Sequence, residues 1–150
     1  RITDVPGASS VFHCGIVSYS NEIKNKILGV SKENLDRYGA VSAVVAAEMA
    51  LGVKELSGAD FGVSVTGMAG PESDDPKIPV GRIYIAVTDG EQLYIKELNT
   101  GHSGKDCRDY NRFVSASNAL NELRLCALSY PEKRSEGTDI KEFISSFKEL

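Results

Sequence analysis

The feature that most constrains the fold of this 150-residue chain is a hairpin signal near its middle. Residues 81–98 read GRIYIAVTDGEQLYIKEL, two runs rich in β-branched and aromatic residues joined by Asp89-Gly90. An Asp-Gly pair between two such runs is the commonest signal for a tight turn between antiparallel strands. At least one strand is therefore expected to be antiparallel, which excludes a purely parallel Rossmann sheet.

The segments on either side of the hairpin predict further strands and helices. Two more strands are expected, His13–Ser20 (HCGIVSYS) and Phe61–Gly67 (FGVSVTG), and a long polar loop follows at residues 68–79. Capping residues and apolar spacing predict helices at Ser20 to Gly29, Ser31 to Gly39, Ser42 to Gly58, Asp106 to Tyr130 and Thr138 to Leu150. Arg1–Asp4 read as the last turn of a helix, from which we expect residues upstream of Arg1.

Two of these helices have apolar faces that can be assigned from their spacing. In the helix after Ser42 the face consists of Val44, Val45, Met49 and Val53. In the long helix the predicted face consists of Phe113, Ala116, Leu120, Leu123 and Ala127, and Pro131 is expected to stop the helix.

The order of elements is β, α, α, α, β, β, β, α, with a helical stub in front. This order predicts an α/β fold, a three-layer α/β/α domain around a mixed sheet that contains the antiparallel hairpin. We expect one α/β domain at residues 1–130, followed by a linker and a short C-terminal amphipathic helix at residues 131–150.

Composition excludes several classes of function. A net charge of -4 provides no global basic field, so neither nucleic acid nor a membrane is expected as a partner. No apolar run is long enough to span a bilayer. Three cysteines without CxxC spacing and two histidines form no zinc or haem pattern, so no metal or cofactor is expected. Unpaired cysteines favour a reducing, cytoplasmic location.

One lysine raises a question about chemistry. In VSYSNEIKNKILGV, residues 17–30, Ser20 is a natural N-cap, and Lys24 then lies at the end of the first helical turn. One interpretation is a solvated surface lysine, because its neighbours are polar. The other is a lysine whose pKa is lowered at the positive end of the helix, so that it can act as a base.

Two further segments are candidates for a binding site. The strand that ends at Thr66 continues as Gly67-Met68-Ala69-Gly70, where glycines permit positive φ and backbone N–H groups could bind an anion or an oxyanion. The alternative is a turn whose glycines serve geometry alone, and no GK[ST] follows to make a phosphate-binding P-loop.

The second segment is GHSGKDCRDYNR, residues 101–112. Arg108 and Arg112 lie one turn apart at the start of the long helix, which is a favourable place for a phosphate. The alternative is an ordinary pair of surface arginines neutralised by nearby aspartates. His102 could be a general base or merely solvated. The pair Asp74-Asp75 lacks a third metal ligand.

Several stretches, in the same order along the chain, resemble a known family. They are RITDVPGASSVF, GIVSYSNEIKNKILGV, RYGAVS, VTGMAGP and KIPVGRIYIAV. Together they are similar to the C-terminal domain of the CinA family of competence/damage-inducible proteins, over about Arg1 to Leu128. The resemblance implies a mixed-sheet α/β/α fold and a homo-oligomer.

The resemblance also implies an activity, the deamidation of nicotinamide mononucleotide (NMN) to nicotinic acid mononucleotide and ammonia in pyridine-nucleotide recycling. In the family the proposed nucleophile is the serine of an ESCTGG motif, which would precede Arg1, and the lysine of YSN-x-x-K, here Lys24, activates it. Arg108 is the best match for an arginine implicated near the start of the last helix. The other site residues carried over are Tyr19 in a catalytic role and Asn21, Thr66, Gly67, Gly70 and Arg112 in substrate binding.

Two departures from the family pattern bear on this transfer. The ESCTGG motif is not among these residues, and Glu72-Ser73-Asp74-Asp75 replaces a glycine-rich continuation and adds negative charge near the expected phosphate site. The alternative function is a non-catalytic domain that binds a nucleotide or a protein and assembles oligomers. The presence or absence of the upstream serine separates the two.

Overall fold

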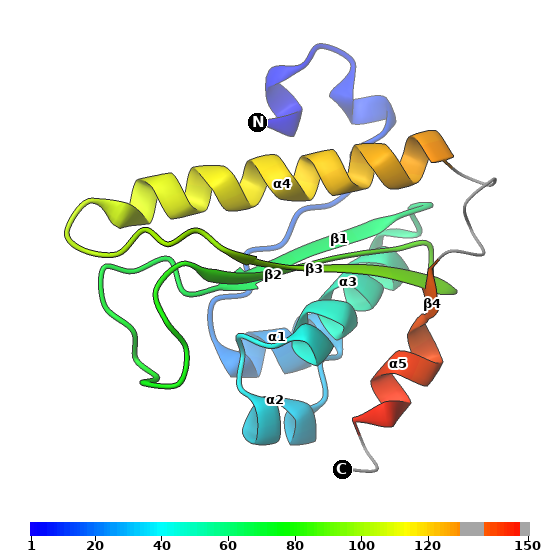
Figure 1. Ribbon diagram of the computed structural model, residues 1–150. Helices are drawn as coiled ribbons and strands as arrows, with labels where there is room; N and C mark the ends of the chain where they lie inside the picture. The colour runs from blue at the N-terminus through cyan, green and yellow to red at the C-terminus, as the bar shows by residue number, and fades with distance from the viewer. Residues whose placement is uncertain (130–136, 148–150) are drawn as a thin grey trace.

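A four-stranded antiparallel sheet forms the centre of the computed structural model, which describes residues 1–129 and 137–147 (Figure 1). Its order is β1-β2-β3-β4, with the bounds Gly62–Gly67, Arg82–Thr88, Gln92–Asn99 and Thr138–Asp139. The predicted hairpin is confirmed, since β2 and β3 pair from Arg82↔Asn99 to Thr88↔Leu93. The Asp89 carboxylate accepts hydrogen bonds from the backbone N–H groups of Glu91 and Gln92, which closes the turn.

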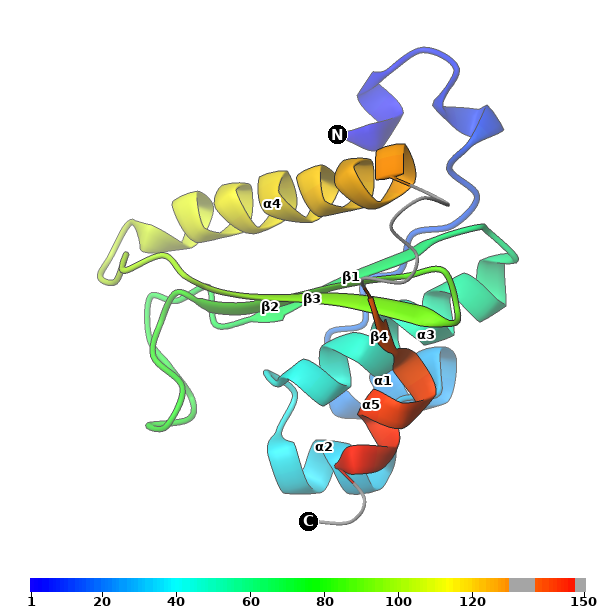
Figure 2. The same cartoon turned by 45° about the vertical axis from the view of Figure 1, so that its right-hand side comes forward.

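Helices cover both faces of the sheet, so the α/β class and the layered arrangement are confirmed (Figures 1 and 2). One long helix, α4 (Cys107–Ser129), lies across one face, and the N-terminal residues lie beyond it. Two 3₁₀ turns, η1 (Ile2–Asp4) and η2 (Ala8–Ser10), form that N-terminal part, so Arg1–Asp4 is a short turn in the described residues. On the other face lie α1 (Asn21–Leu28), α2 (Lys32–Tyr38), α3 (Ala43–Ser57) and α5 (Ile140–Ser146).

Helix α3 lies in the core, where it packs against the sheet on one side and against α1 and α2 on the other. Val44, Val45 and Met49 are buried as their spacing predicts, and they pack with residues of α1 and α2. Helix α3 also approaches β1 closely, since a Cβ on Gly62 would collide with the carbonyl oxygen of Ala50. The close approach fixes β1, whose carboxyl end forms part of the candidate site.

The prediction of a strand at residues 13–20 is wrong, because this segment is not a strand of the described sheet. Residues 12–19 are extended, and their side chains alternate between partly buried and exposed, as in a half-buried strand. Within the described residues, however, the backbone groups of residues 13–17 form no hydrogen bond, and β1 pairs only with β2. All described strand pairs are therefore antiparallel, and the sheet is not mixed.

The apolar face predicted for α4 is only partly correct. Phe113 is 62% exposed, while the buried residues of this helix are Cys107, Asn111, Ala119 and Cys126. Small side chains let the helix lie close to the sheet, where Ala119 packs against Ile83 and Ile85. Spacing alone favoured the larger apolar residues, and those turn partly toward solvent instead.

The C-terminal segment also differs from the prediction. Thr138 and Asp139 form β4, and the helix begins only at Ile140 because the Asp139 carboxylate accepts a hydrogen bond from the N–H of Glu142, 2.8 Å away. The predicted helix end at Tyr130, the stop at Pro131 and most of the predicted linker lie outside the described residues.

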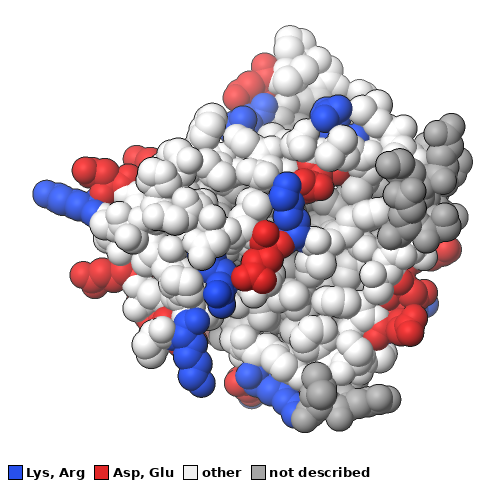
Figure 3. All heavy atoms as spheres, in the orientation of Figure 1, with Lys and Arg blue, Asp and Glu red and all other residues white. Residues whose placement is uncertain are grey.

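The charges on the surface are mixed in sign. On the face shown in Figure 3, Lys and Arg side chains lie next to Asp and Glu side chains among uncharged residues. Two of the ion pairs are Lys96–Glu122 and Arg82–Glu97, with nitrogen–oxygen distances of 2.6 and 3.3 Å. None of the described helices is long and apolar enough to cross a membrane.

Candidate active site

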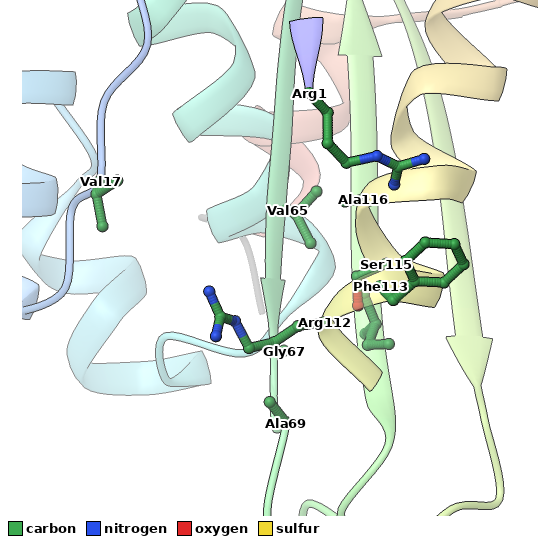
Figure 4. A pocket seen from close by; sticks show the side chains of 10 residues that line it. Arg1, Val17, Val65, Gly67, Ala69, Arg112, Phe113, Ser115 and Ala116 are labelled. Carbon is green, nitrogen blue, oxygen red and sulfur yellow. The ribbon is translucent and has the colours of Figure 1, made fainter. Parts of the chain in front are cut away.

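A groove of about 640 Å³ lies beside the open edge of β1 (Figure 4). One wall is the extended segment with Val17, the floor is the carboxyl end of β1, and the other wall is α4. Its lining is formed by Arg1, Val17, Val65, Gly67, Ala69, Ile83, Arg112, Phe113, Ser115 and Ala116. This volume is within the range of small-molecule sites, and the lining combines apolar side chains with the two cations Arg1 and Arg112.

The turn after β1 is held in place by the first turns of α4. The Arg108 guanidinium donates a hydrogen bond to the Gly70 carbonyl oxygen at 2.9 Å, and the Cys107 thiol lies 3.5 Å from the Ala69 carbonyl oxygen. Gly70 has φ +89°, and a Cβ there would lie 2.5 Å from Cys107 Sγ. A glycine is therefore required at this position for both conformation and space.

Asn111 is a site residue that the sequence reasoning missed. Its side chain is fully buried, and its Nδ2 donates to the carbonyl oxygens of Ala69 (3.0 Å) and His102 (3.1 Å). Its Oδ1 accepts from the Thr100 hydroxyl at 2.6 Å. Asn111 thus joins α4, the β1 turn and the loop before α4. The only signal in the sequence was an asparagine inside a helix, where its intrinsic preference is low.

Lys24 is buried rather than solvated. Its side chain is 6% exposed, and its Nζ donates hydrogen bonds to the backbone carbonyl oxygens of Ser18 (2.8 Å) and Tyr19 (3.4 Å). Ser20 caps the helix as predicted, accepting a hydrogen bond from Ile23 N at 3.2 Å. Burial lowers the pKa of Lys24 below its usual value of 10.5, because the charged amine loses water. This is the direction expected of a lysine that acts as a base, and its cause is burial rather than the positive end of the helix.

The other predicted residues near Lys24 occupy different environments. Tyr19 is 84% exposed and Asn21 is also exposed, and neither is among the residues that line the groove. Thr66 is buried, and its hydroxyl donates to the Ala40 carbonyl oxygen at 2.6 Å. Its side chain is directed at the loop between α2 and α3, so Thr66 supports the turn.

The two predicted arginines are both exposed but do different things. Arg112 lines the groove, and Figure 4 shows its side chain extending from α4 past the end of β1. Arg108 is tied to the Gly70 carbonyl oxygen and is not among the lining residues. Arg112 therefore lines the groove together with Gly67 and Ala69, whereas Arg108 holds the turn after β1 and does not line the groove.

Two backbone donors remain available at the turn. Within the described residues the N–H groups of Ala69 and Gly70 donate no hydrogen bond, whereas the N–H of Met68 donates to the Arg82 carbonyl oxygen at 2.9 Å. Adjacent free N–H groups beside a guanidinium can bind a phosphate or a developing oxyanion.

The acidic loop after this turn is engaged in its own hydrogen bonds. The Ser73 hydroxyl donates to the carbonyl oxygens of Asp75 and Ile78, and the Asp75 carboxylate accepts from Lys77 N at 2.8 Å. In the part of the chain that the structure describes, no group of three or more His, Cys, Asp or Glu residues is placed to hold a metal ion.

Comparisons of sequence place this geometry among known proteins. A family model described as the CinA C-terminal domain matches residues 1–127. A relative from Thermoanaerobacter sp. (strain X514) is 54% identical over 98 residues, which cover 65% of this chain and 24% of the relative. A CinA-like protein from Thermosynechococcus vestitus is 46% identical over 132 residues, which cover 87% of this chain and 31% of that protein. The chain thus spans about a quarter to a third of the length of these relatives.

A solved structure has the same fold. The competence/damage inducible protein CihA from Agrobacterium tumefaciens superimposes with a TM-score of 0.76 at 34% sequence identity. The match covers 83% of this chain and 74% of that one. The layered arrangement described above is therefore shared with a protein named for competence and damage induction.

Proposed function

The chain belongs to the CinA C-terminal domain family. On that basis we propose that it is part of an amidohydrolase, which converts NMN to nicotinic acid mononucleotide and ammonia. The observation that carries the proposal is the buried Lys24, whose Nζ bonds to the carbonyl oxygen of Ser18. Ser18 follows Val17 of the groove lining, while Lys24 itself is not among the lining residues. A neutral amine has two N–H groups and one lone pair. The carbonyl oxygens of Ser18 and Tyr19 accept hydrogen bonds from these two N–H groups. The lone pair is then left to accept a proton.

The chemistry needs a base because an amide is a poor electrophile at neutral pH. In the proposed reaction Lys24 accepts the proton of a serine hydroxyl as the serine oxygen attacks the carboxamide carbon. The carbon–nitrogen bond then breaks, and the nitrogen leaves as ammonia after it takes up a proton. Water hydrolyses the resulting ester, which releases the carboxylate and restores the serine.

The rest of the groove has groups suited to the remainder of NMN. The free N–H groups of Ala69 and Gly70 would bind the oxyanion or the phosphate, and Arg112 would pair with the phosphate dianion. Arg108 would hold the turn in place through Gly70. The serine would come from the ESCTGG segment that the family resemblance places before Arg1.

If Arg112 binds the phosphate, its removal should weaken the binding of NMN but not of a ligand that lacks the phosphate. Arg112→Ala is expected to weaken NMN binding by about 1.5–3 kcal/mol, the scale of a hydrogen bond to a charged group. Nicotinamide riboside, which lacks the phosphate, should bind the variant and the parent equally. Titration calorimetry with both ligands measures the difference.

The matched control is Arg124→Ala, since Arg124 lies on the same helix and bonds to Asn121. It should bind both ligands normally. If Arg108→Ala loses the full NMN affinity and Arg112→Ala loses none, the phosphate binds at the first turn of α4 instead. An equal loss for both ligands in Arg112→Ala would show that the arginine does not recognise the phosphate.

A second candidate function is non-catalytic binding of a protein, with assembly of a homo-oligomer. One observation favours it: the extended residues 13–17 and the outer edge of β1 both lack backbone partners within the described residues. Such edges accept an added strand. NMN turnover by a form that includes the upstream serine separates this function from the amidohydrolase.

A further inference from the structure

The C-terminal strand and helix lie outside the family match, which ends at residue 127. They are nevertheless anchored in the fold. Thr138 and Asp139 of β4 pair with Leu93 and Gln92 of β3. The N–H of Ile140 donates to the Glu91 carbonyl oxygen at 2.8 Å, and the Ile140 side chain is fully buried. Helix α5 therefore starts from a fixed point at the sheet.

From that point α5 reaches α2. The Tyr38 hydroxyl, at the end of α2, donates a hydrogen bond to the Phe147 carbonyl oxygen at 2.7 Å. The two rings meet edge to face with their centroids 5.1 Å apart, and Phe143 lies 5.2 Å from Phe147. A polar bond and an aromatic contact together fix the end of α2.

The end of α2 leads directly into the loop that supports the candidate active site. Residues 39–42 follow Tyr38, and the Ser42 hydroxyl closes this loop on the Gly39 carbonyl oxygen at 2.9 Å. The Ala40 carbonyl oxygen accepts the Thr66 hydroxyl at 2.6 Å. Thr66 is the residue before Gly67, which lines the groove.

We propose that α5 is a positioning element for the candidate active site. Phe147 holds Tyr38, Tyr38 holds the loop at residues 39–42, and that loop holds Thr66 and the turn after β1. Tyr38 and Phe147 are thus positioning residues that lie away from the groove. The Tyr38–Phe147 and Thr66–Ala40 hydrogen bonds connect them to it. The functional consequence rests on the proposed function, whereas the conformational coupling does not.

The coupling is tested by amide hydrogen exchange in the full chain. Tyr38→Phe removes only the hydroxyl and keeps the ring contact. Exchange of the Gly39 and Met68 amides, both hydrogen-bonded in the parent, should accelerate by roughly three- to tenfold, the equivalent of one neutral hydrogen bond. The Ala119 amide on α4 should exchange at its parent rate. Phe147→Ala, which removes the ring, should have the larger effect on the same amides.

Lys141→Ala is the control, because Lys141 lies on the exposed side of the same helix. It should leave all three amides unchanged. Faster exchange at Gly39 with no change at Met68 in both variants would overturn the coupling. An equal acceleration at Ala119 would also overturn it, since the variants would then loosen the whole fold.

A binding measurement tests the functional consequence separately. If the turn holds NMN, Tyr38→Phe should raise the Kd for NMN by roughly threefold while Lys141→Ala leaves it unchanged. If Tyr38→Phe speeds Met68 exchange but leaves the Kd for NMN unchanged, α5 does not position the ligand, and that part of the proposal is overturned. If the parent itself does not bind NMN, the proposed substrate is wrong, and the exchange result alone decides the coupling.

Discussion

Replacing Lys24 with methionine is expected to lower NMN deamidation by roughly 10²–10⁴-fold, the usual contribution of a general base. Methionine keeps most of the length and the apolar stem but has no amine. Folding should change little, because two opposing effects accompany the loss. The carbonyl oxygens of Ser18 and Tyr19 lose their donor, while the cost of burying a charged amine disappears. Ammonia release and melting temperature, measured on a form that includes the upstream serine, check both expectations.

Lys24→Arg is the sharper companion variant. A guanidinium keeps its proton near neutral pH, so this variant should be almost as inactive as Lys24→Met. Lys26→Arg is a suitable control, since Lys26 is exposed on the same helix. If Lys24→Arg keeps most of the activity, the residue supplies charge rather than basicity, and the serine–lysine mechanism is wrong for this protein.

The 150 residues by themselves are expected to release no ammonia from NMN, because they do not include the ESCTGG serine that the family resemblance identifies as the nucleophile. A form that includes that segment should be active, and replacing its serine with alanine should abolish the activity again. The comparison needs equal protein concentrations and one assay of ammonia.

The same comparison has an outcome that contradicts the assignment. Ammonia release by residues 1–150 at the rate of the longer form would place the nucleophile within this chain. Both forms should bind NMN if the groove is the substrate site, so a binding measurement separates a misplaced nucleophile from a misplaced groove.

Local signals predicted most of the fold correctly. The Asp89-Gly90 turn, the serine caps at Ser20 and Ser31 and the apolar face of α3 all depend on neighbours in the sequence, and the structure contains each of them. Residues 12–19 show the limit of such signals. They alternate like a strand, but a strand also needs a partner, and pairing is a property of the tertiary structure.

The candidate site was predictable only in part for the same reason. The segments with Lys24, Gly67 and Arg112 could be identified from the sequence, because their positions at helix and strand ends are local properties. Burial of Lys24 could not be, since its neighbours in the sequence are polar. Nor could the bonds of Asn111 to Ala69 and His102, which join distant parts of the chain.

The lowered pKa of Lys24 has a consequence for stability. In the unfolded chain the amine regains its usual pKa of 10.5, so between the folded pKa and 10.5 the unfolded state binds more protons than the folded state. The free energy of unfolding should therefore rise with pH through that window. Below the window the cost of the buried charge is fully present. The Lys24→Met variant lacks this contribution.

The most direct test of the central claim is an NMR titration of the Lys24 amine in residues 1–150, with the signal assigned by its loss in Lys24→Met. We expect a midpoint clearly below 10.5, the usual value of a lysine, because the amine is buried. We also expect the Lys24→Met difference in unfolding free energy to change between that midpoint and pH 10.5 and to be constant outside this window. A Lys24 midpoint at or above 10.5 would contradict the claim that this lysine is held ready to act as a base.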